Sequence, residues 1–279
     1  MHYLEVHYMD LSTVIGLVLG VVALFVGMVM KGVTPDSLVN PAAILIIIFG
    51  TIASVAIAFP TSELKRVPKL FGILFKERKS TSDADIIRMF SSWADVARRE
   101  GLLSLEAKTG EIDDPFLKNG LGLAIDGQNA DYIRDVLTEE VDAMEDRHSV
   151  GSQIFSQAGT YAPTLGVLGA VVGLVAALKD LSDIDALGVA ISAAFIATLL
   201  GIFTGYVLWH PFANKLKRKS SEEVRQKMMI IEGILSVLEG EAPRVIEQKL
   251  ASYLSMEERR KLISDDSSGK GADRVAEET

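Results

Sequence analysis

The longest uncharged stretch of the chain runs over Ser149–Leu178, about thirty residues. A helix needs only about twenty apolar residues to cross a bilayer core. Small or ring-shaped side chains recur in it at helical spacing, at Pro163, Gly166, Ala170, Gly173 and Ala177. Such a stripe lets another helix backbone come close, as membrane helix packing requires. Pro163 also frees a backbone carbonyl near residues 157–159. The stretch therefore predicts a kinked packing helix, and it allows a helix that lines a permeation path.

Three further apolar runs carry no Asp, Glu, Lys or Arg, at Leu11–Met30, Ser37–Ser62 and Ala186–Asn214. The sequence thus predicts an all-α, polytopic membrane protein with four transmembrane helices in two pairs. The turn at residues 31–36 is short, which predicts that residues 11–62 form an antiparallel hairpin. The first and fourth runs carry close-packing stripes of their own, which include Gly16, Gly20, Thr198, Gly201 and Gly205.

Basic residues gather directly after the second run. Six of them precede Ser80 against two glutamates: Lys65, Arg66, Lys69, Lys76, Arg78 and Lys79. The connection after Leu178 is acidic, and Lys215, Lys217, Arg218 and Lys219 follow the fourth run. Positive residues favour the cytoplasmic side. We therefore expect the segments after the second and fourth runs in the cytoplasm, and we expect the N-terminus outside.

The segments outside the four apolar runs carry signals that predict helices. Ser82 or Thr81 can cap a helix that ends at Gly101, and Asp114-Pro115 opens another. The helix over residues 131–144 has no turn signal before the long apolar stretch, so we expect the two to be continuous. Pro211 is expected to end the fourth helix, and Ser220 or Ser221 to start a new one. Gly240, Ala242-Pro243 and Ser255 then mark one helix end and two starts.

These signals predict the following divisions: an extracellular N-terminus over 1–10, with Met9 as a possible functional start; the hairpin 11–62; a cytoplasmic helical domain 63–148; a second transmembrane hairpin 149–214; a cytoplasmic helical segment 215–264; and a disordered tail 265–279.

Composition excludes several classes of function. The net charge of −9 argues against a nucleic-acid partner. The chain has no cysteine, and its four histidines lack ligand-like spacing, so we expect no metal site and no cofactor. No nucleophile constellation or phosphate-binding loop is present, so an enzyme is not expected.

The four runs bring hydroxyls but no carboxylate to the membrane. Ionisable groups at bilayer depth usually mark proton or cation relays, whereas hydroxyls such as Thr164, Thr198 and Thr204 cannot carry a proton by themselves. If this protein moves ions, a partner helix must supply the acid, and the small-residue stripes of the third and fourth helices are where that helix would dock. Thr198 could alternatively only satisfy its own helix backbone.

Four segments carry a resemblance to a known family: RREGLLSLE (Arg98–Glu106), PTLGVLGAVVGL (Pro163–Leu174), AAFIATLLGIFTGY (Ala193–Tyr206) and HPFANKL (His210–Leu216). With the two helix pairs and the large insert between them, they make the chain resemble the MotA family of flagellar stator subunits from Met9 to about Glu258. The resemblance implies a multi-pass protein of the bacterial cytoplasmic membrane.

The resemblance also implies partners and residue roles. Family members form a homo-oligomeric ring, a pentamer, around a MotB-like single-pass protein that supplies the ion-carrying aspartate. Arg98 and Glu106 match the charged pair that contacts the rotor switch-complex protein, which is FliG-like. Pro163 and Pro211 match two functional prolines, and Thr198 matches the threonine that faces the partner's aspartate.

Position 170 bears on the coupling ion. Relatives resembling the sodium-driven PomA and MotP proteins tend to carry threonine there, whereas Ala170 offers no oxygen to a cation. We therefore expect a proton-driven stator subunit. A sodium-driven stator subunit, an ExbB- or TolQ-like energy-transducing subunit and a non-conducting structural membrane subunit remain the alternatives.

Overall fold

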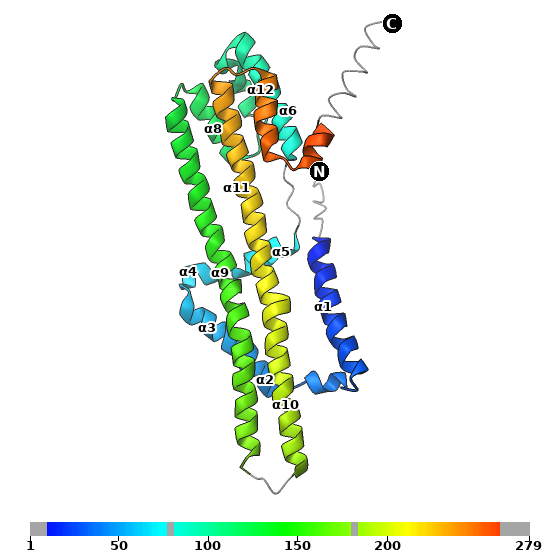
Figure 1. Ribbon diagram of the computed structural model, residues 1–279. Helices are drawn as coiled ribbons and strands as arrows, with labels where there is room; N and C mark the ends of the chain where they lie inside the picture. Colours follow the sequence, from blue (N-terminus) through cyan, green and yellow to red (C-terminus); the bar gives the residue numbers. More distant parts are fainter. Residues whose placement is uncertain (1–9, 77–80, 180–183, 263–279) are drawn as a thin grey trace, which may run out of the picture. The chain divides into compact units, whose positions relative to one another are not determined.

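The computed structural model describes residues 10–76, 81–179 and 184–262, which contain helices and turns but no β-strand. The chain divides into two compact units, one drawn from Met1–Arg78 and Asp146–Ser220 and the other from Lys79–Glu145 and Ser221–Thr279 (Figure 1). The expected start at Met9 and the expected tail 265–279 lie outside the described residues. The all-α fold class is confirmed.

Four helical stretches are long and apolar enough to cross a membrane: Leu11–Met30, Pro41–Ala58, Ala130–Ala177 and Ile184–Leu238. The first is α1. The second consists of α2 (Pro41–Ile44), a wider π-helical segment η2 (Leu45–Phe49) and α3 (Gly50–Ala58). The third is α9 (Ala130–Ala177), which runs without a break through Pro163, as the missing turn signal predicted.

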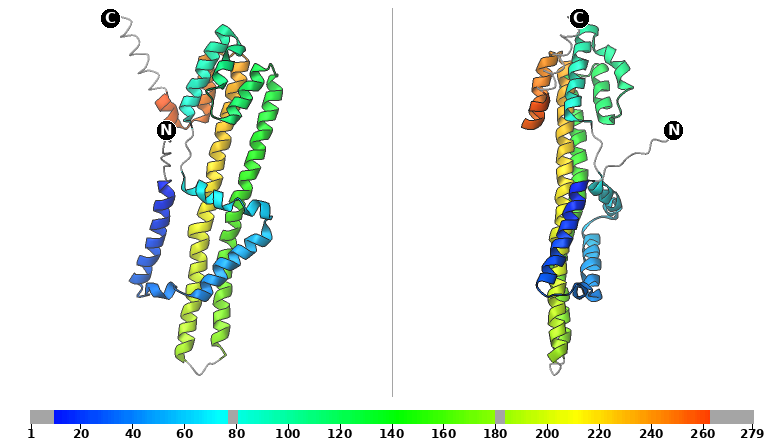
Figure 2. Two further views of the ribbon diagram at one scale, coloured as in Figure 1. Left: turned by 180° about the vertical axis from the view of Figure 1, so that it is seen from behind. Right: turned by 90° about the vertical axis from the view of Figure 1, so that its right-hand side faces the viewer.

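The predicted hairpin over 11–62 is wrong in its packing. The first two spans are joined by residues 31–40, which include the short 3-10 helix η1 (Pro35–Leu38). This connection carries the chain sideways, so that α1 packs against α5 (Val67–Phe75) and α2 packs against α10 (Ile184–Phe203). Figures 1 and 2 show α1 apart from α3. Because the connection over residues 31–40 is longer than the expected turn, the first two spans need not pack against each other, and each packs against another helix.

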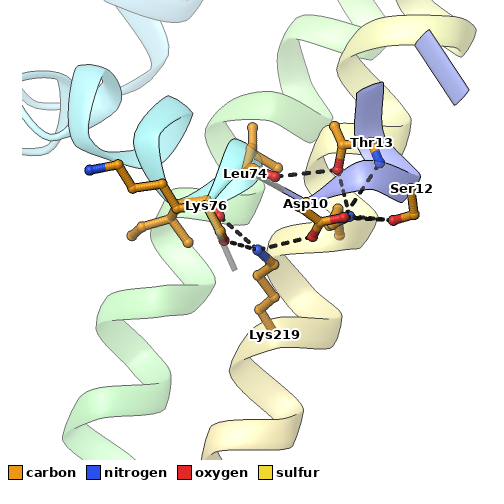
Figure 3. A network of polar contacts seen from close by, with 8 residues as sticks. Asp10, Ser12, Thr13, Leu74, Lys76 and Lys219 are labelled. Atoms are coloured by element: carbon orange, nitrogen blue, oxygen red, sulfur yellow. Dashed lines mark hydrogen bonds and ion pairs between the residues drawn. The ribbon is translucent and has the colours of Figure 1, made fainter. Parts of the chain in front are cut away.

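Asp10, just before α1, lies close to Lys76, which follows the second span, and to Lys219 (Figure 3). The Asp10 backbone N–H donates to the Phe75 carbonyl at 3.0 Å, and the Asp10 carboxylate pairs with Lys215 and Lys219. The Lys219 ammonium also donates to the Lys76 carbonyl at 2.8 Å. The start of α1 at Asp10 and the described residues 63–76 therefore lie at the same end of this unit, which contradicts the expectation that these two segments are on opposite sides of the membrane, because two crossings return the chain to the side from which it started.

The contacts of Asp10 fix its charge. Burial alone would raise the pKa of this carboxyl, but hydrogen bonds from Lys215, Ser12 and Lys219 and the charge of Lys215 outweigh it and hold the pKa well below the ordinary range. Asp10 is also the N-cap of α1, since its side chain accepts from the Thr13 N–H. Asp10 thus stays ionised and ties α1 to α5 and α11 (His210–Leu238) at physiological pH.

The helix that contains the fourth span is longer than predicted. After α10, residues 204–209 form a π-helical segment, η4 (Thr204–Trp209), and α11 continues directly from it. Pro211 therefore does not end the helix, and no new helix starts at Ser220 or Ser221. A proline lacks the N–H that the preceding turn needs, and a widened π turn is one way for a helix to accommodate it. The expected boundary between 149–214 and 215–264 falls inside this continuous helix.

The second unit matches its sequence signals closely. Ser82 caps α6 (Asp83–Glu100), Gly101 follows it with φ +87°, and Asp114 caps α8 (Pro115–Ile125). The unit is completed by η3 (Leu102–Leu105), α7 (Glu106–Thr109), the adjoining ends of α9 and α11, α12 (Pro243–Leu250) and η5 (Ala251–Tyr253). Phe90, Leu105 and Leu121 are among the side chains that fill its core.

The remaining helices of the first unit lie where the second span ends. α4 (Thr61–Leu64) and α5 follow Pro60. Phe71 of α5 packs edge-on against Phe155 of α9, with ring centroids 5.1 Å apart, and Leu74 is fully buried beside them. Burial of large aromatic side chains is a strong stabilising contribution. This cluster fixes α5 on the two long helices, while Lys65, Arg66 and Lys69 remain exposed.

Candidate functional site

The third and fourth spans meet where both carry glycine. A methyl group added to Gly201 would lie 2.8 Å from the Ala162 carbonyl oxygen and 2.9 Å from the Gly166 Cα atom. A methyl group added to Gly166 would lie 2.9 Å from the Ala197 carbonyl oxygen. Real Cβ atoms do not approach backbone this closely, so only glycine fits on either side. The α9 and α10 backbones are therefore in direct contact here, as small residues permit in membrane helices.

This contact corrects one expectation from the sequence. The stripes of the third and fourth helices were expected to receive a partner's helix, but at Gly166 and Gly201 the neighbour is a helix of this same chain. Gly173, about two turns beyond Gly166 on α9, has open space in front of it. Of the stripes on α1, Gly16 is open, whereas Gly20 faces the Val207 side chain. The close contacts within this chain therefore do not extend to Gly16 and Gly173.

Pro163 lies half-buried one turn before Gly166 and meets η4. A methyl group on Gly205 would lie 2.8 Å from the Gly159 carbonyl oxygen and 2.8 Å from Cγ of Pro163. The Gly159 carbonyl is the one that Pro163 leaves without its helical N–H partner. The Cα–H of Gly205 therefore approaches a carbonyl that needs a partner, a weak contact of the kind seen between closely packed helices.

Thr198 and Ala170 lie deeper in the same helix pair. The Thr198 hydroxyl donates to the Ala194 carbonyl at 3.1 Å, which satisfies its own helix and leaves an oxygen lone pair free. Ala170 is only 8% exposed and belongs to a cluster with Ala43, Ile47 and Ala197. Ala170 thus faces the chain's own second and fourth spans, and no oxygen stands at its position.

Comparison with known proteins shows the family to which this chain belongs. Residues 108–229 match the family model described as the MotA/TolQ/ExbB proton channel family. Motility protein A of Bacillus subtilis is 65% identical over 91% of this chain and 94% of its own length. This chain belongs to the MotA family.

Solved structures of the MotA family share the fold. The flagellar MotAB stator complex of Bacillus subtilis contains a chain that matches with a TM-score of 0.87 at 65% identity, over 90% of this chain and 99% of that one. The MotAB structure of C. jejuni matches with a TM-score of 0.84 at 33% identity, over 89% and 97%. The protein is therefore a flagellar stator subunit of the MotA family, a multi-pass protein of the cytoplasmic membrane, and is not an enzyme.

The structure separates the residues singled out from the sequence into three places. Pro163, Gly166, Gly201 and Gly205 come together at the α9–α10 contact. Pro211 is exposed at the start of α11, directly after His210, whose ring lies against Gly159. Arg98 and Glu106 are in the second unit, where both are exposed on either side of the buried Leu105. No group of acidic or histidine side chains within the described ranges could hold a metal ion.

Two polar residues at the junction of η4 and α11 were not singled out as site residues. His210 begins α11, and Tyr206 precedes it by four residues, with the two rings 5.2 Å apart. The sequence placed His210 in the fourth apolar run, but only the fold brings its ring against Gly159 of α9. Its presence among otherwise uncharged residues was a signal that could have been used.

Proposed function

We propose that protons drive this stator subunit, and that they cross the membrane where α9 and α10 meet the helix of a MotB-like partner. The single observation that carries this is the chemistry of the spans, which bring hydroxyls but no Asp, Glu, Lys or Arg to bilayer depth. A cation such as sodium needs several oxygen ligands, whereas a proton needs one carboxyl and water. The absence of an oxygen at the buried Ala170 supports the proton.

The partner follows from the missing carboxylate. The related solved structures are MotAB complexes, and a MotB-like aspartate would supply the group that this chain lacks. Several copies of the chain, a pentamer, would form a ring around that partner. One elementary charge moving through 100 mV provides about 2.3 kcal/mol, enough to bias a step between nearly equivalent positions of such a ring.

The charges also support an orientation. Lys65, Arg66 and Lys69 are exposed on or beside α4 and α5, and positively charged segments favour the cytoplasm. Since Asp10 is bonded to Phe75 and Lys219 at that same end, the start of α1 is cytoplasmic as well. The connections after α1 and α9 then face the exterior.

The choice of ion is tested by swimming speed in cells whose only stators contain this chain and its partner. We expect an uncoupler to stop swimming completely and the removal of sodium to leave the speed unchanged, because only the proton gradient supplies energy. Speed is measured in buffers with potassium in place of sodium. A speed that follows the sodium concentration while the proton gradient is intact would refute the proposal.

The second unit is proposed to dock on a FliG-like rotor protein through Arg98 and Glu106, which are both exposed. Arg98→Asp should weaken rotor engagement about tenfold or more, because like charges across an interface repel. The readout is motor torque together with membrane abundance and co-purification with the partner, which should stay normal. Lys118→Asp, an exposed reversal on α8 of the same unit, is the matched control. Full torque from Arg98→Asp would contradict the docking assignment.

A further inference from the structure

The fourth apolar run contains a histidine that the preceding argument does not use. His210 is the first residue of α11 and follows η4 directly. Three of its ring carbons lie 2.8, 2.8 and 2.9 Å from where a methyl group on Gly159 would be. Gly159 is four residues before Pro163, so the imidazole packs against the turn of α9 whose hydrogen bonding the proline interrupts.

The ring of His210 is placed to exchange a proton. It is half-buried, and neither ring nitrogen has a hydrogen-bond partner among the side chains and backbone that the structure describes. The titratable group in contact with it is the Tyr206 phenol on its own helix. The α9 residue in contact with it, Gly159, has no side chain and carries no charge. The imidazole is thus held by packing, with its nitrogens left for water or for a partner's group.

A row of hydroxyls passes the same turn of α9. Its members are spaced four residues apart, at Ser152, Ser156, Thr160 and Thr164. The hydroxyls of Thr164, Thr160 and Ser152 donate to the carbonyls of Tyr161, Ser156 and Ser149, respectively. Three of the four donors are therefore used within the helix, while the oxygen lone pairs remain able to accept from water.

The row leads toward the basic end of the unit. A methyl group on Gly151, next to Ser152, would lie 3.1 Å from the Leu70 side chain of α5. The hydroxyls therefore extend from the level of Pro163 to the level of α5. They offer polar anchors for water along the uncharged part of α9, between the middle of the span and the end where Lys65, Arg66 and Lys69 are exposed.

We propose that His210 is a proton-relay residue on the cytoplasmic side of the ion path, which rests on the proposed proton-driven function. An N–H bond forms at a free ring nitrogen as the O–H bond of the partner's carboxylic acid, or of a hydronium ion, breaks. The imidazolium then returns the proton to water along the Ser152–Thr164 row, and the neutral ring is restored. Histidine suits this role because a neutral imidazole has one ring nitrogen that accepts a proton and another that donates one.

The test uses the full chain with its partner, in cells that lack other stators. His210→Gln keeps most of the side-chain volume but cannot relay a proton, and we expect motor speed to fall roughly tenfold. In the unchanged chain, speed at a fixed proton-motive force should depend on pH, because the relay passes through a protonated and a neutral imidazole. His210→Gln should lose this pH dependence. His210→Ala, which leaves space beside Gly159, should regain speed when imidazole is added.

His148→Gln is the matched control, because His148 lies on α9 and bonds Ser220 through its ring instead of facing Gly159. We expect it to keep its speed and its pH profile. If His210→Gln assembles with the partner and runs at full speed with an unaltered pH profile, the relay is refuted while proton drive stands. If the speed of motors with the unchanged chain follows the sodium concentration, the proposed proton-driven function is refuted, and the relay that rests on it is refuted as well. A His210→Gln motor that is slow but keeps its pH profile would assign the residue a packing role and overturn the relay.

Discussion

Gly201→Val should abolish a functional assembly of the membrane spans. The new side chain would have to enter space held by the Ala162 carbonyl oxygen at 2.8 Å and the Gly166 Cα atom at 2.9 Å. Overpacking typically costs about 1–3 kcal/mol when side chains can move aside. Here both opposing atoms are backbone atoms of a long helix, so α9 and α10 must separate along their length. We expect loss of motility and loss of the purified complex.

The measurement is the yield and thermal unfolding temperature of the complex in detergent, together with motility. Gly166→Val should behave in the same way, since its methyl position faces the Ala197 carbonyl oxygen at 2.9 Å. Gly173→Val is the matched control for the stability of this chain, because it makes the same change on α9 where no atom lies within 4 Å. A stable, motile Gly201→Val complex would show that the two backbones are not in contact.

Asp114→Ala should destabilise the second unit by about 3–5 kcal/mol, because it leaves a buried lysine without its counter-charge. The Lys227 ammonium donates to both carboxylate oxygens of Asp114, at 2.8 and 2.7 Å, and lies 4.6 Å from the centre of the Phe116 ring. The Lys227 side chain is 8% exposed and that of Asp114 is 35% exposed. Removing the acid also removes the N-cap of α8, which accepts from the Phe116 N–H at 2.9 Å.

Two variants separate these contributions. Asp114→Asn keeps a cap oxygen but removes the charge, so the difference between it and Asp114→Ala measures the cap, about 1 kcal/mol. Lys227→Met in the Asp114→Asn background removes the unpaired cation and should restore most of the lost stability. The measurement is the unfolding temperature of the full-length protein. Equal unfolding temperatures for Asp114→Ala and the unchanged chain would contradict the role of the ion pair.

The same pair predicts a pH dependence. Burial would raise the pKa of the Asp114 carboxyl, but hydrogen bonds from Lys227, its charge and the Phe116 and Leu117 N–H groups lower it on balance. A carboxyl whose pKa is lowered in the folded state contributes its stabilisation above the ordinary aspartate pKa, and loses it as the pH falls toward the folded-state value. We therefore expect the second unit to be stable at neutral pH and to lose this contribution only in acid. The Asp114→Asn variant should not show that loss.

Much of the fold could be predicted because its signals are local. The ends of α1 are set by the apolar run Leu11–Met30, and those of α6 by Ser82 and Gly101, where capping chemistry acts within one turn. The continuity of α9 followed from the absence of any turn signal. The fourth span could not be delimited in this way. Pro211 and Ser220 are strong local signals, but the π turn of η4 and packing along α11 override them.

The candidate site also has features that local sequence predicts and features that it does not. The sequence by itself determined four uncharged spans, stripes of small residues around Pro163 and Gly201, and a chain with no membrane carboxylate, because composition and helical period are properties of each segment alone. Only the tertiary structure decided which glycines face a helix of the same chain, that Asp10 returns to Phe75 and Lys219, and that His210 meets Gly159. Those pairings join residues far apart in the chain, and backbone packing, not local preference, selects them.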